Sequence, residues 1–130
     1  MREIRFRGKR KDTGEWVYGY LIGNDVIVGD IVEFSDEYFN TEFWYKVDPK
    51  TVGQFTGIKD KNGTWIYEGD ILRDEFDRVF RVYWVDGEAR FAIRQKKRKT
   101  EYFMVINHIH SVAIGNIWDN PELLKGEETV

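Results

Sequence analysis

Residues 52–72, VGQFTGIKDKNGTWIYEGDIL, constrain the fold more than any other part of the chain. The dipeptide Asn62-Gly63 lies between two runs rich in apolar, β-branched and aromatic residues. Both residues tolerate a positive φ, which a tight turn between antiparallel strands requires, so the segment predicts a β-hairpin. A second turn at residues 68–70 precedes another apolar run. The segment therefore predicts a closely connected all-β fold, and it indicates no nucleophile, phosphate-binding loop or metal-binding cluster.

Short apolar runs separated by turn residues predict the other strands. The expected strands are residues 4–7, 16–22, 26–28, 31–34, 38–47, 52–55, 64–67, 71–73, 79–85, 89–93, 102–106 and 112–114. Asp86-Gly87 predicts a second hairpin, and residues 79–85 carry apolar side chains on both faces, which predicts a central strand. Asn120 and Pro121 begin a helical turn of residues 120–125, with Asn120 as its N-cap.

Asp48-Pro49 interrupts the strand pattern and is the best candidate for a domain boundary. We therefore expect an all-β protein, mostly β with a short C-terminal helical turn. Residues 1–49 would form a smaller N-terminal β subdomain, and residues 50–130 a second β subdomain with a helical tail. The turn-to-strand sequence Gly29-Asp30 recurs at Gly69-Asp70, which indicates either a duplicated module or a common way of leaving a turn.

The composition excludes several classes of protein. Among 130 residues, 16% are aromatic, and such side chains provide the large buried areas that a small β domain needs. The absence of cysteine excludes a disulfide-stapled scaffold, a thiolate zinc site and a cysteine nucleophile. The N-terminus lacks the apolar region of a signal peptide, and no apolar run approaches a membrane span. We expect a soluble cytoplasmic protein, without a membrane partner, and the net charge of −3 disfavours a general nucleic-acid coat.

Four motifs together carry a resemblance to a known family: MREIRFR at residues 1–7, VGQFTGIKDKNG at 52–63, IYEGDI at 66–71 and IGNIWDNPELL at 114–124. In these motifs the chain resembles the YopX-like family of phage and prophage proteins, whose function is uncharacterised. The resemblance implies an SH3-like barrel over residues 50–130 and a protein that acts in the bacterial cytoplasm. It implies no catalytic residues and no cofactor, and residues 20–45 match none of its motifs.

A basic run between two predicted strands is the first candidate site. A cationic loop beside aromatic rings suits single-stranded nucleic acid, because the charges track phosphates and the rings stack on bases. The alternative is a solvated hairpin tip whose like charges prevent the edge from pairing with other chains. The candidate nucleic-acid residues are Arg94, Lys96, Lys97, Arg98 and Lys99, with Phe91 and Tyr102 beside them.

An aromatic run is the second candidate site. So many rings cannot all reach the core of a small domain, so they either pack over the other subdomain or form a contact patch for another chain. A patch of this kind suits a protein partner or a homo-oligomer. The candidate protein-interaction residues are Tyr38, Phe39, Phe43, Trp44 and Tyr45.

Three further patterns favour structural roles over chemistry. His108 and His110 would share one face of a strand, but a metal site needs a third ligand. Gly-Asp before an aliphatic strand is usually turn chemistry, so we expect no catalysis from the carboxylates of Glu68, Asp70 and Asp74. Gly53 and Gly57 precede neither a helix nor a Lys-Ser/Thr pair, and we interpret them as bends in a strand.

We therefore expect a non-enzymatic phage or prophage accessory protein that binds an unknown host or phage protein and holds no metal or cofactor. The alternative is a small β-barrel that binds nucleic acid through the loop from Arg94 to Lys99.

Overall fold

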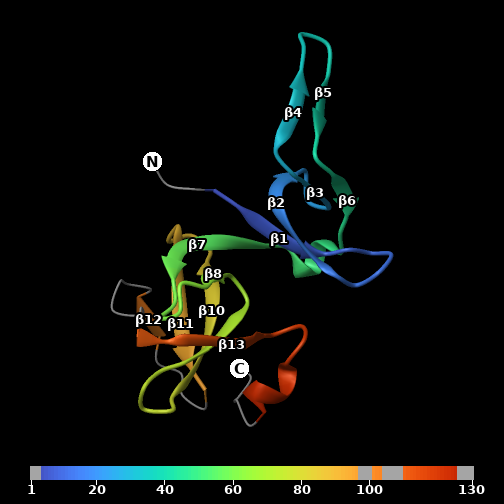
Figure 1. The fold of residues 1–130 in the computed structure, drawn as a ribbon. Coiled ribbons are helices and arrows are strands. Elements are labelled where there is room, and N and C mark those ends of the chain that lie inside the picture. Colours follow the sequence, from blue (N-terminus) through green and yellow to red (C-terminus); the bar gives the residue numbers. More distant parts are fainter. Residues whose placement is uncertain (1–3, 97–100, 104–109, 126–130) are drawn as a thin grey trace. The chain divides into compact units, whose positions relative to one another are not determined.

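The computed structural model describes residues 4–96, 101–103 and 110–125, and it is mostly β, as predicted (Figure 1). Its described helical segments include two 3-10 turns, η1 (Pro49–Thr51) and η3 (Pro121–Leu124). Within the described ranges, no helix is long and apolar enough to cross a membrane. The strands are β1 (Phe6–Lys9), β2 (Trp16–Ile22), β3 (Val26–Val28), β4 (Ile31–Phe34), β5 (Phe39–Thr41), β6 (Trp44–Lys46), β7 (Gly53–Lys59), β8 (Trp65–Tyr67), β9 (Asp70–Arg73), β10 (Val79–Val85), β11 (Arg90–Gln95), β12 (Glu101–Phe103) and β13 (Val112–Asn116).

The chain divides into two compact units, Met1–Phe55 and Thr56–Val130, hereafter unit 1 and unit 2. The division falls inside β7, C-terminal to the Asp48-Pro49 position favoured by the sequence. Pro49 itself begins η1, whose N-cap Asp48 accepts a hydrogen bond from the Lys50 N–H.

Unit 1 is an antiparallel sheet with the strand order β6-β3-β2-β1, and Gly53 and Gln54 of β7 pair with β1. Ile27 and Val47 are its fully buried aliphatic side chains. Gly19 stands opposite the backbone of Val28, where a Cβ would collide with the carbonyl group. Only glycine fits at this close approach, so the strand order of unit 1 depends on that position.

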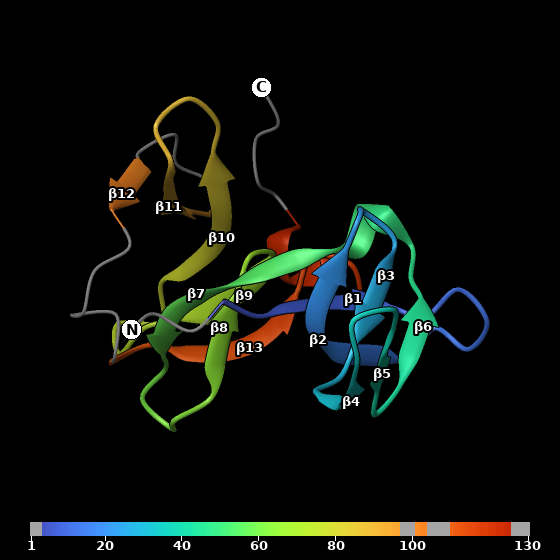
Figure 2. The same ribbon diagram turned by 90° about the horizontal axis from the view of Figure 1, so that it is seen from above.

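A separate two-stranded sheet, the β4–β5 hairpin, extends from unit 1 (Figures 1 and 2). The expectation of one strand over residues 38–47 is wrong, because β5 ends at Thr41 and β6 begins at Trp44. Phe43 between them accepts hydrogen bonds at its carbonyl from the Gly29 N–H and the Thr41 hydroxyl, and its ring covers Gly29. These contacts turn the chain from the hairpin into the sheet of unit 1.

Unit 2 contains a five-stranded antiparallel sheet with the order β12-β11-β10-β9-β13, and β10 is its central strand, as predicted. The hairpin expected at Asp86-Gly87 joins β10 to β11, and that at Asn62-Gly63 joins β7 to β8. The core of unit 2 contains Ile66 of β8, Leu72 of β9, Phe80 and Val82 of β10, and Ile93 of β11.

In the parts of the chain that the structure describes, no sheet closes on itself, so the SH3-like barrel is not confirmed. The predicted helical turn is present as η3, with Asn120 at the N-cap position. Its side chain makes no capping hydrogen bond there; instead Asn120 Oδ1 accepts one from the Asn116 N–H at 3.2 Å.

Candidate functional site: the β4–β5 hairpin

The β4–β5 hairpin has one apolar face. Phe34 pairs with Phe39 and Ile31 pairs with Thr41, and directly paired residues of an antiparallel sheet point to the same side. Phe34 is 74% exposed and Ile31 is 58% exposed, while Phe39 is also exposed. A bulge between Ile31 and Glu33 shifts the register so that both apolar pairs lie on one face.

Two shallow hollows adjoin this face within unit 1, each of about 350 Å³. Both are lined by Phe39 and by Ile22 and Val28 of the neighbouring sheet. One extends to Tyr20 and Ile31, and the other extends to Trp44, which is 63% exposed. We call the exposed apolar side chains around these hollows the hairpin surface: Tyr20, Ile22, Ile31, Phe34, Phe39 and Trp44.

Glu33, Tyr38 and Asn40 form a hydrogen-bonded polar group on the opposite face of the hairpin. The Tyr38 hydroxyl donates to Glu33 Oε1 at 2.5 Å, and the Asn40 amide donates to Glu33 Oε2 at 3.3 Å. The hydrogen bond from Tyr38 chiefly, and then that from Asn40, lowers the pKa of the Glu33 carboxyl. The hydrogen bond that Tyr38 donates to Glu33 also raises the pKa of the Tyr38 hydroxyl. These contacts tie β4 to β5 on the face away from the hairpin surface.

Replacing Tyr38 with phenylalanine is expected to raise the pKa of Glu33 toward its ordinary value, because the charged carboxylate loses its main donor. A carboxyl with a lowered folded-state pKa stabilises the fold above its unfolded pKa, and this contribution disappears as the pH falls through the folded value. Carbon-detected NMR titration of the Glu33 carboxyl would measure the change. Asn40→Ala should shift the pKa in the same direction by less, and a larger shift in that variant would contradict the assignment.

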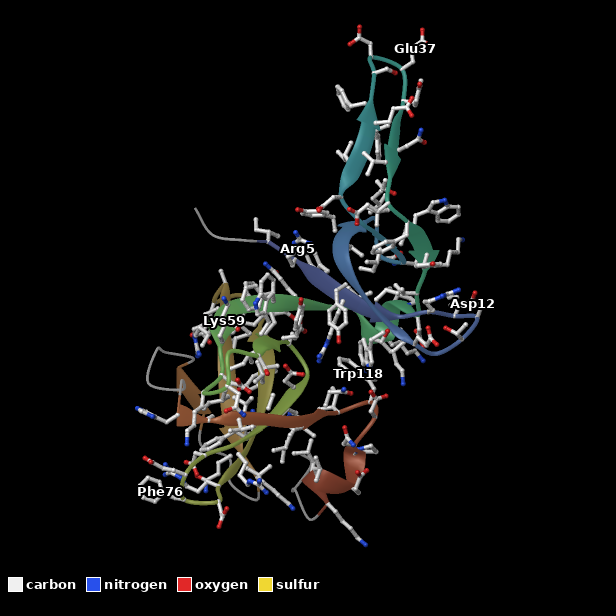
Figure 3. The ribbon with its side chains drawn as sticks, viewed as in Figure 1. Arg5, Asp12, Glu37, Lys59, Phe76 and Trp118 are labelled. Carbon is white, nitrogen blue, oxygen red and sulfur yellow. The ribbon has the colours of Figure 1, made fainter. Side chains whose placement is uncertain are left out.

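The hairpin lies in a strongly acidic part of the sequence. Residues 12–45 contain eight Asp and Glu residues and no Lys, Arg or His. The formal charge of this segment is therefore −8, whereas that of the whole chain is −3. Acidic side chains of the hairpin and its ends are Asp30, Glu33, Asp36, Glu37 and Glu42, and Figure 3 labels Glu37 at the tip. This charge asymmetry is visible in the sequence. It marks a surface that none of the sequence motifs indicates.

The structure separates the five aromatic residues predicted as an interaction patch. Tyr38, Phe39 and Trp44 are exposed. Phe43 and Tyr45 are half-buried and stack on each other at 5.5 Å between ring centroids, and the Arg10 guanidinium lies 3.9 Å from the Tyr45 centroid. Phe34, the most exposed large apolar residue of the described chain, lies outside the predicted run.

The register of unit 2 separates the residues predicted for nucleic acid. Phe91 pairs with Trp84 and packs edge-on against it at 4.9 Å, whereas Arg94 pairs with Arg81 on the opposite face of the sheet. The ring near Arg94 is that of Tyr83, at 5.4 Å. Lys96 is half-buried after β11, and Tyr102 lies in β12. Lys97, Arg98 and Lys99 lie outside the described residues.

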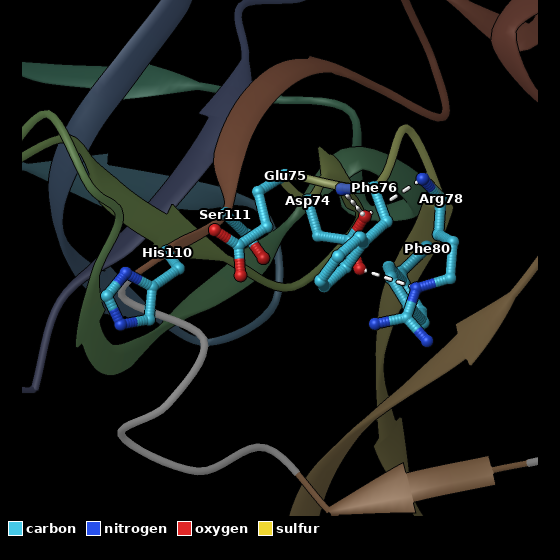
Figure 4. A pocket seen from close by; sticks show the side chains of 7 residues that line it. All are labelled: Asp74, Glu75, Phe76, Arg78, Phe80, His110 and Ser111. Carbon is cyan, nitrogen blue, oxygen red and sulfur yellow. Dashed lines mark hydrogen bonds and ion pairs between the residues drawn. The ribbon is translucent and has the colours of Figure 1, made fainter.

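Unit 2 has a hollow of about 260 Å³ beside the β9–β10 turn (Figure 4). There Asp74 accepts hydrogen bonds from the Phe76 N–H, the Arg78 N–H and the Arg78 guanidinium, at 3.0, 2.9 and 2.7 Å. Burial raises the pKa of the Asp74 carboxyl, but these hydrogen bonds outweigh burial and lower it. The carboxylate is thus committed to holding the turn. His110 lines the same hollow and is exposed, while His108, which was expected to share a strand face with it, lies outside the described residues.

Among the described residues, no group of three His, Cys, Asp or Glu side chains has the placement to hold a metal ion. Asp70 is buried, and its Oδ2 accepts the Tyr67 N–H at 2.7 Å, which is turn chemistry. The related Asp30 is exposed and lies 3.7 Å from the Arg5 guanidinium. Gly69 has a φ of 91°, whereas Gly29 does not have a positive φ, so the two Gly-Asp sequences form different local structures.

The motifs of the family resemblance that follow residue 55 supply residues that stabilise unit 2. Asp60 accepts hydrogen bonds from the backbone of Asn62, Thr64 and Ala113, and Asn116 Oδ1 accepts from the backbone of the next turn. These side chains serve turns and strand ends, and none of them belongs to the hairpin surface. These motifs therefore account for turns of unit 2 and do not form the hairpin surface of unit 1.

Comparison with known proteins agrees with this fold. The crystal structure of a protein from Enterococcus faecalis is similar, with a TM-score of 0.63 and 24% identity, covering 96% of this chain and 100% of that chain. At that identity the similarity shows the fold alone. A search of curated proteins finds no match. The family model described as YopX protein matches residues 5–125, which is most of the chain. The chain therefore belongs to the YopX family.

Proposed function

We propose that this chain is a non-enzymatic accessory protein, encoded by a phage or prophage, that binds a protein partner in the bacterial cytoplasm. The observation that carries the proposal is the hairpin surface, where large apolar side chains of the β4–β5 hairpin and of the adjoining strands β2 and β6 lie exposed. Exposed apolar side chains that adjoin one another, rather than being scattered singly, mark interaction sites. Aromatic residues such as Phe34, Phe39 and Trp44 are those enriched in protein interfaces.

The unit 1 side chains favour binding over catalysis. The hollow beside Phe39 that extends to Tyr20 and Ile31 is shallow and mainly apolar, and the nearby carboxylates of Asp30 and Glu33 are already engaged by Arg5, Tyr38 and Asn40. General acid–base work needs a pocket in which polar groups converge on one reacting atom. A binding surface needs only an apolar centre with a polar rim, and this arrangement is present.

Phe34 provides a direct test because Phe76 of unit 2 is a matched control, 70% exposed against 74%. A photo-crosslinking phenylalanine analogue would be placed at position 34 or 76 and the protein expressed in lysogenic and infected cells. We expect a specific adduct from position 34 that Phe39→Ser and Trp44→Ser in the same chain abolish, because removing apolar side chains from the centre of an interface weakens binding by tenfold or more, about 1–3 kcal/mol each.

The adduct would then be identified by mass spectrometry and reconstituted from purified components. An adduct with a second copy of the chain would mean that the protein forms a homo-oligomer through this surface. Light scattering would then give a mass in solution above the monomer mass of 15.5 kDa. Equal adducts from positions 34 and 76, or none from either, would refute the hairpin surface as the binding site.

A second candidate function is nucleic-acid binding by unit 2. It is supported by the direct cross-strand pairing of Arg81 with Arg94 and by the position of both guanidinium groups within 6 Å of the Tyr83 ring, at 5.9 and 5.4 Å. Two like charges paired across strands repel, and bound phosphate would offset the repulsion. We also retain as a proposal that unit 2 is a variant of the SH3-like barrel, because its short antiparallel strands include a bulge at Ala113 and Gly115, which bends a sheet.

A further inference from the structure

We propose that the partner presents to the β4–β5 hairpin an extended strand in which Lys or Arg alternates with apolar residues, and that this strand pairs with an open edge of the hairpin. The inference rests on the proposed function and names the chemistry of the partner at the same site. Three observations carry it: the charge of the segment, the open edges of its two strands, and the different character of its two faces.

The charge of the hairpin selects a basic partner. Residues 12–45 contain eight carboxylates and no cation, and five of these carboxylates lie in the hairpin and at its ends. Arg5, Arg10 and Lys46 from outside the segment pair with Asp30, Asp12 and Asp25, whereas in the hairpin strands and tip no such ion pair is seen for Glu33, Asp36 or Glu37 among the described residues. Their mutual repulsion is relieved by a cationic partner and increased by nucleic acid or by another acidic chain. Asp30 already illustrates the preference, because its carboxylate lies 3.7 Å from the Arg5 guanidinium while remaining more than half exposed.

The edges of the hairpin select an extended partner. In the described part of the chain, β4 pairs only with β5, so each strand has an outer edge to which no other strand is paired. An isolated two-stranded sheet is marginally stable in water, and a third strand adds both backbone hydrogen bonds and covered apolar area. Addition of a strand at an exposed edge is a recurrent mode of peptide recognition.

The faces of the hairpin select the alternation. Side chains of an added strand point by turns to the two sides of the sheet. On one side they would meet Ile31, Phe34 and Phe39, which are apolar and exposed. On the other side they would meet Glu33, whose carboxylate accepts hydrogen bonds from Tyr38 and Asn40. Apolar residues at every second position, with Lys or Arg between them, satisfy both sides at once.

Binding of synthetic peptides to the full-length protein tests this pairing. The probe is a fluorescent ten-residue peptide in which lysine alternates with valine or threonine. There are three control peptides. In the first, glutamate replaces lysine; in the second, the same residues are grouped into a lysine block and an apolar block. In the third, every second backbone amide is N-methylated, so that the edge facing the hairpin cannot donate hydrogen bonds. We expect the probe to bind at least about tenfold more tightly than each control, since the controls remove the charge, the alternation or the backbone hydrogen bonds.

NMR chemical-shift mapping should place the bound probe on residues 31–41. Asp36→Lys/Glu37→Lys at the tip is expected to weaken binding about tenfold at low salt, because it reverses two charges that attract the peptide. The matched control Glu75→Lys/Asp86→Lys reverses two exposed charges of unit 2 and should leave the affinity unchanged.

Equal binding of the glutamate or N-methylated peptide, or shifts confined to unit 2, would overturn the inference. So would a single-stranded oligonucleotide that shifts residues 31–41 in place of the peptide. A partner crosslinked at Phe34 through a segment that is not a basic strand would overturn the inference and leave the proposed function standing. Absence of any specific Phe34 adduct would remove the proposed function itself, so the two failures are distinguishable.

Discussion

Replacing Asp60 with alanine is expected to destabilise the protein by about 3 kcal/mol, because three backbone N–H groups lose their carboxylate acceptor and each such part-buried hydrogen bond contributes roughly 1 kcal/mol. Asp60 is only 5% exposed. Its Oδ1 accepts from Asn62 N at 2.8 Å and Thr64 N at 2.9 Å, and its Oδ2 accepts from Ala113 N at 2.9 Å. The first two bonds hold the β7–β8 turn, and the third ties that turn to β13.

Urea unfolding followed by tryptophan fluorescence would measure this loss. The Asp60→Asn variant should lose less stability than Asp60→Ala, because its amide keeps one acceptor oxygen for the turn. It should still lose some, because the amide NH2 group faces a backbone N–H that the carboxylate had accepted. The matched control is Asp86→Ala, an exposed aspartate in the β10–β11 turn, where we expect a change within about 0.5 kcal/mol. A loss below about 1 kcal/mol for Asp60→Ala would show that water replaces the carboxylate at little cost and that the turn does not depend on it.

Most strands could be predicted from the sequence because turn residues mark their ends. Asn62-Gly63 and Asp86-Gly87 both mark hairpins, and Gly63 and Gly87 adopt φ of 80° and 83°. The break between β5 and β6 was missed for a different reason. It depends on Phe43, whose carbonyl is hydrogen-bonded by Gly29 from an earlier part of the chain. A run of aromatic residues carries no local sign of such a contact, so periodicity alone extends the strand through it.

The sequence indicated only part of the candidate site, because the rest depends on strand pairing that has no local sequence signal. Aromatic density left open whether the surplus rings pack over the other subdomain or lie exposed, and Tyr38, Phe39 and Trp44 lie exposed. It could not identify Phe34, whose exposure follows from its place on a two-stranded sheet. Phe91 and Arg94 lie on opposite faces because β11 continues to Gln95, whereas the predicted strand ended at residue 93 and left Arg94 in a loop. The one sequence signal that would have marked the hairpin is the absence of cations between Lys11 and Lys46.

Gly69→Ala is the second substitution with a large expected effect, about 2–4 kcal/mol of lost stability. Gly69 has a φ of 91°, a conformation that strains any side chain-bearing residue by roughly 1–2 kcal/mol. An added Cβ would also overlap the indole ring of Trp118, which adds roughly 1–2 kcal/mol of overpacking. The backbone has little room to shift, because Gly69 N donates to the Val82 carbonyl and Gly69 O accepts from Ile117 N, both at 2.9 Å.

Gly63→Ala separates the two contributions to that loss, because Gly63 has a φ of 80° but nothing within 4 Å of where its Cβ would stand. It should show the conformational part alone, about 1–2 kcal/mol by urea unfolding. Adding Gly69→Ala to a Trp118→Ala background should likewise cost only this part, because the overlapping ring has gone. If Gly69→Ala cost no more than Gly63→Ala in the native background, the Trp118 ring would be free to move. The contact between the β8–β9 turn and the segment after β13 would then be loose rather than close-packed.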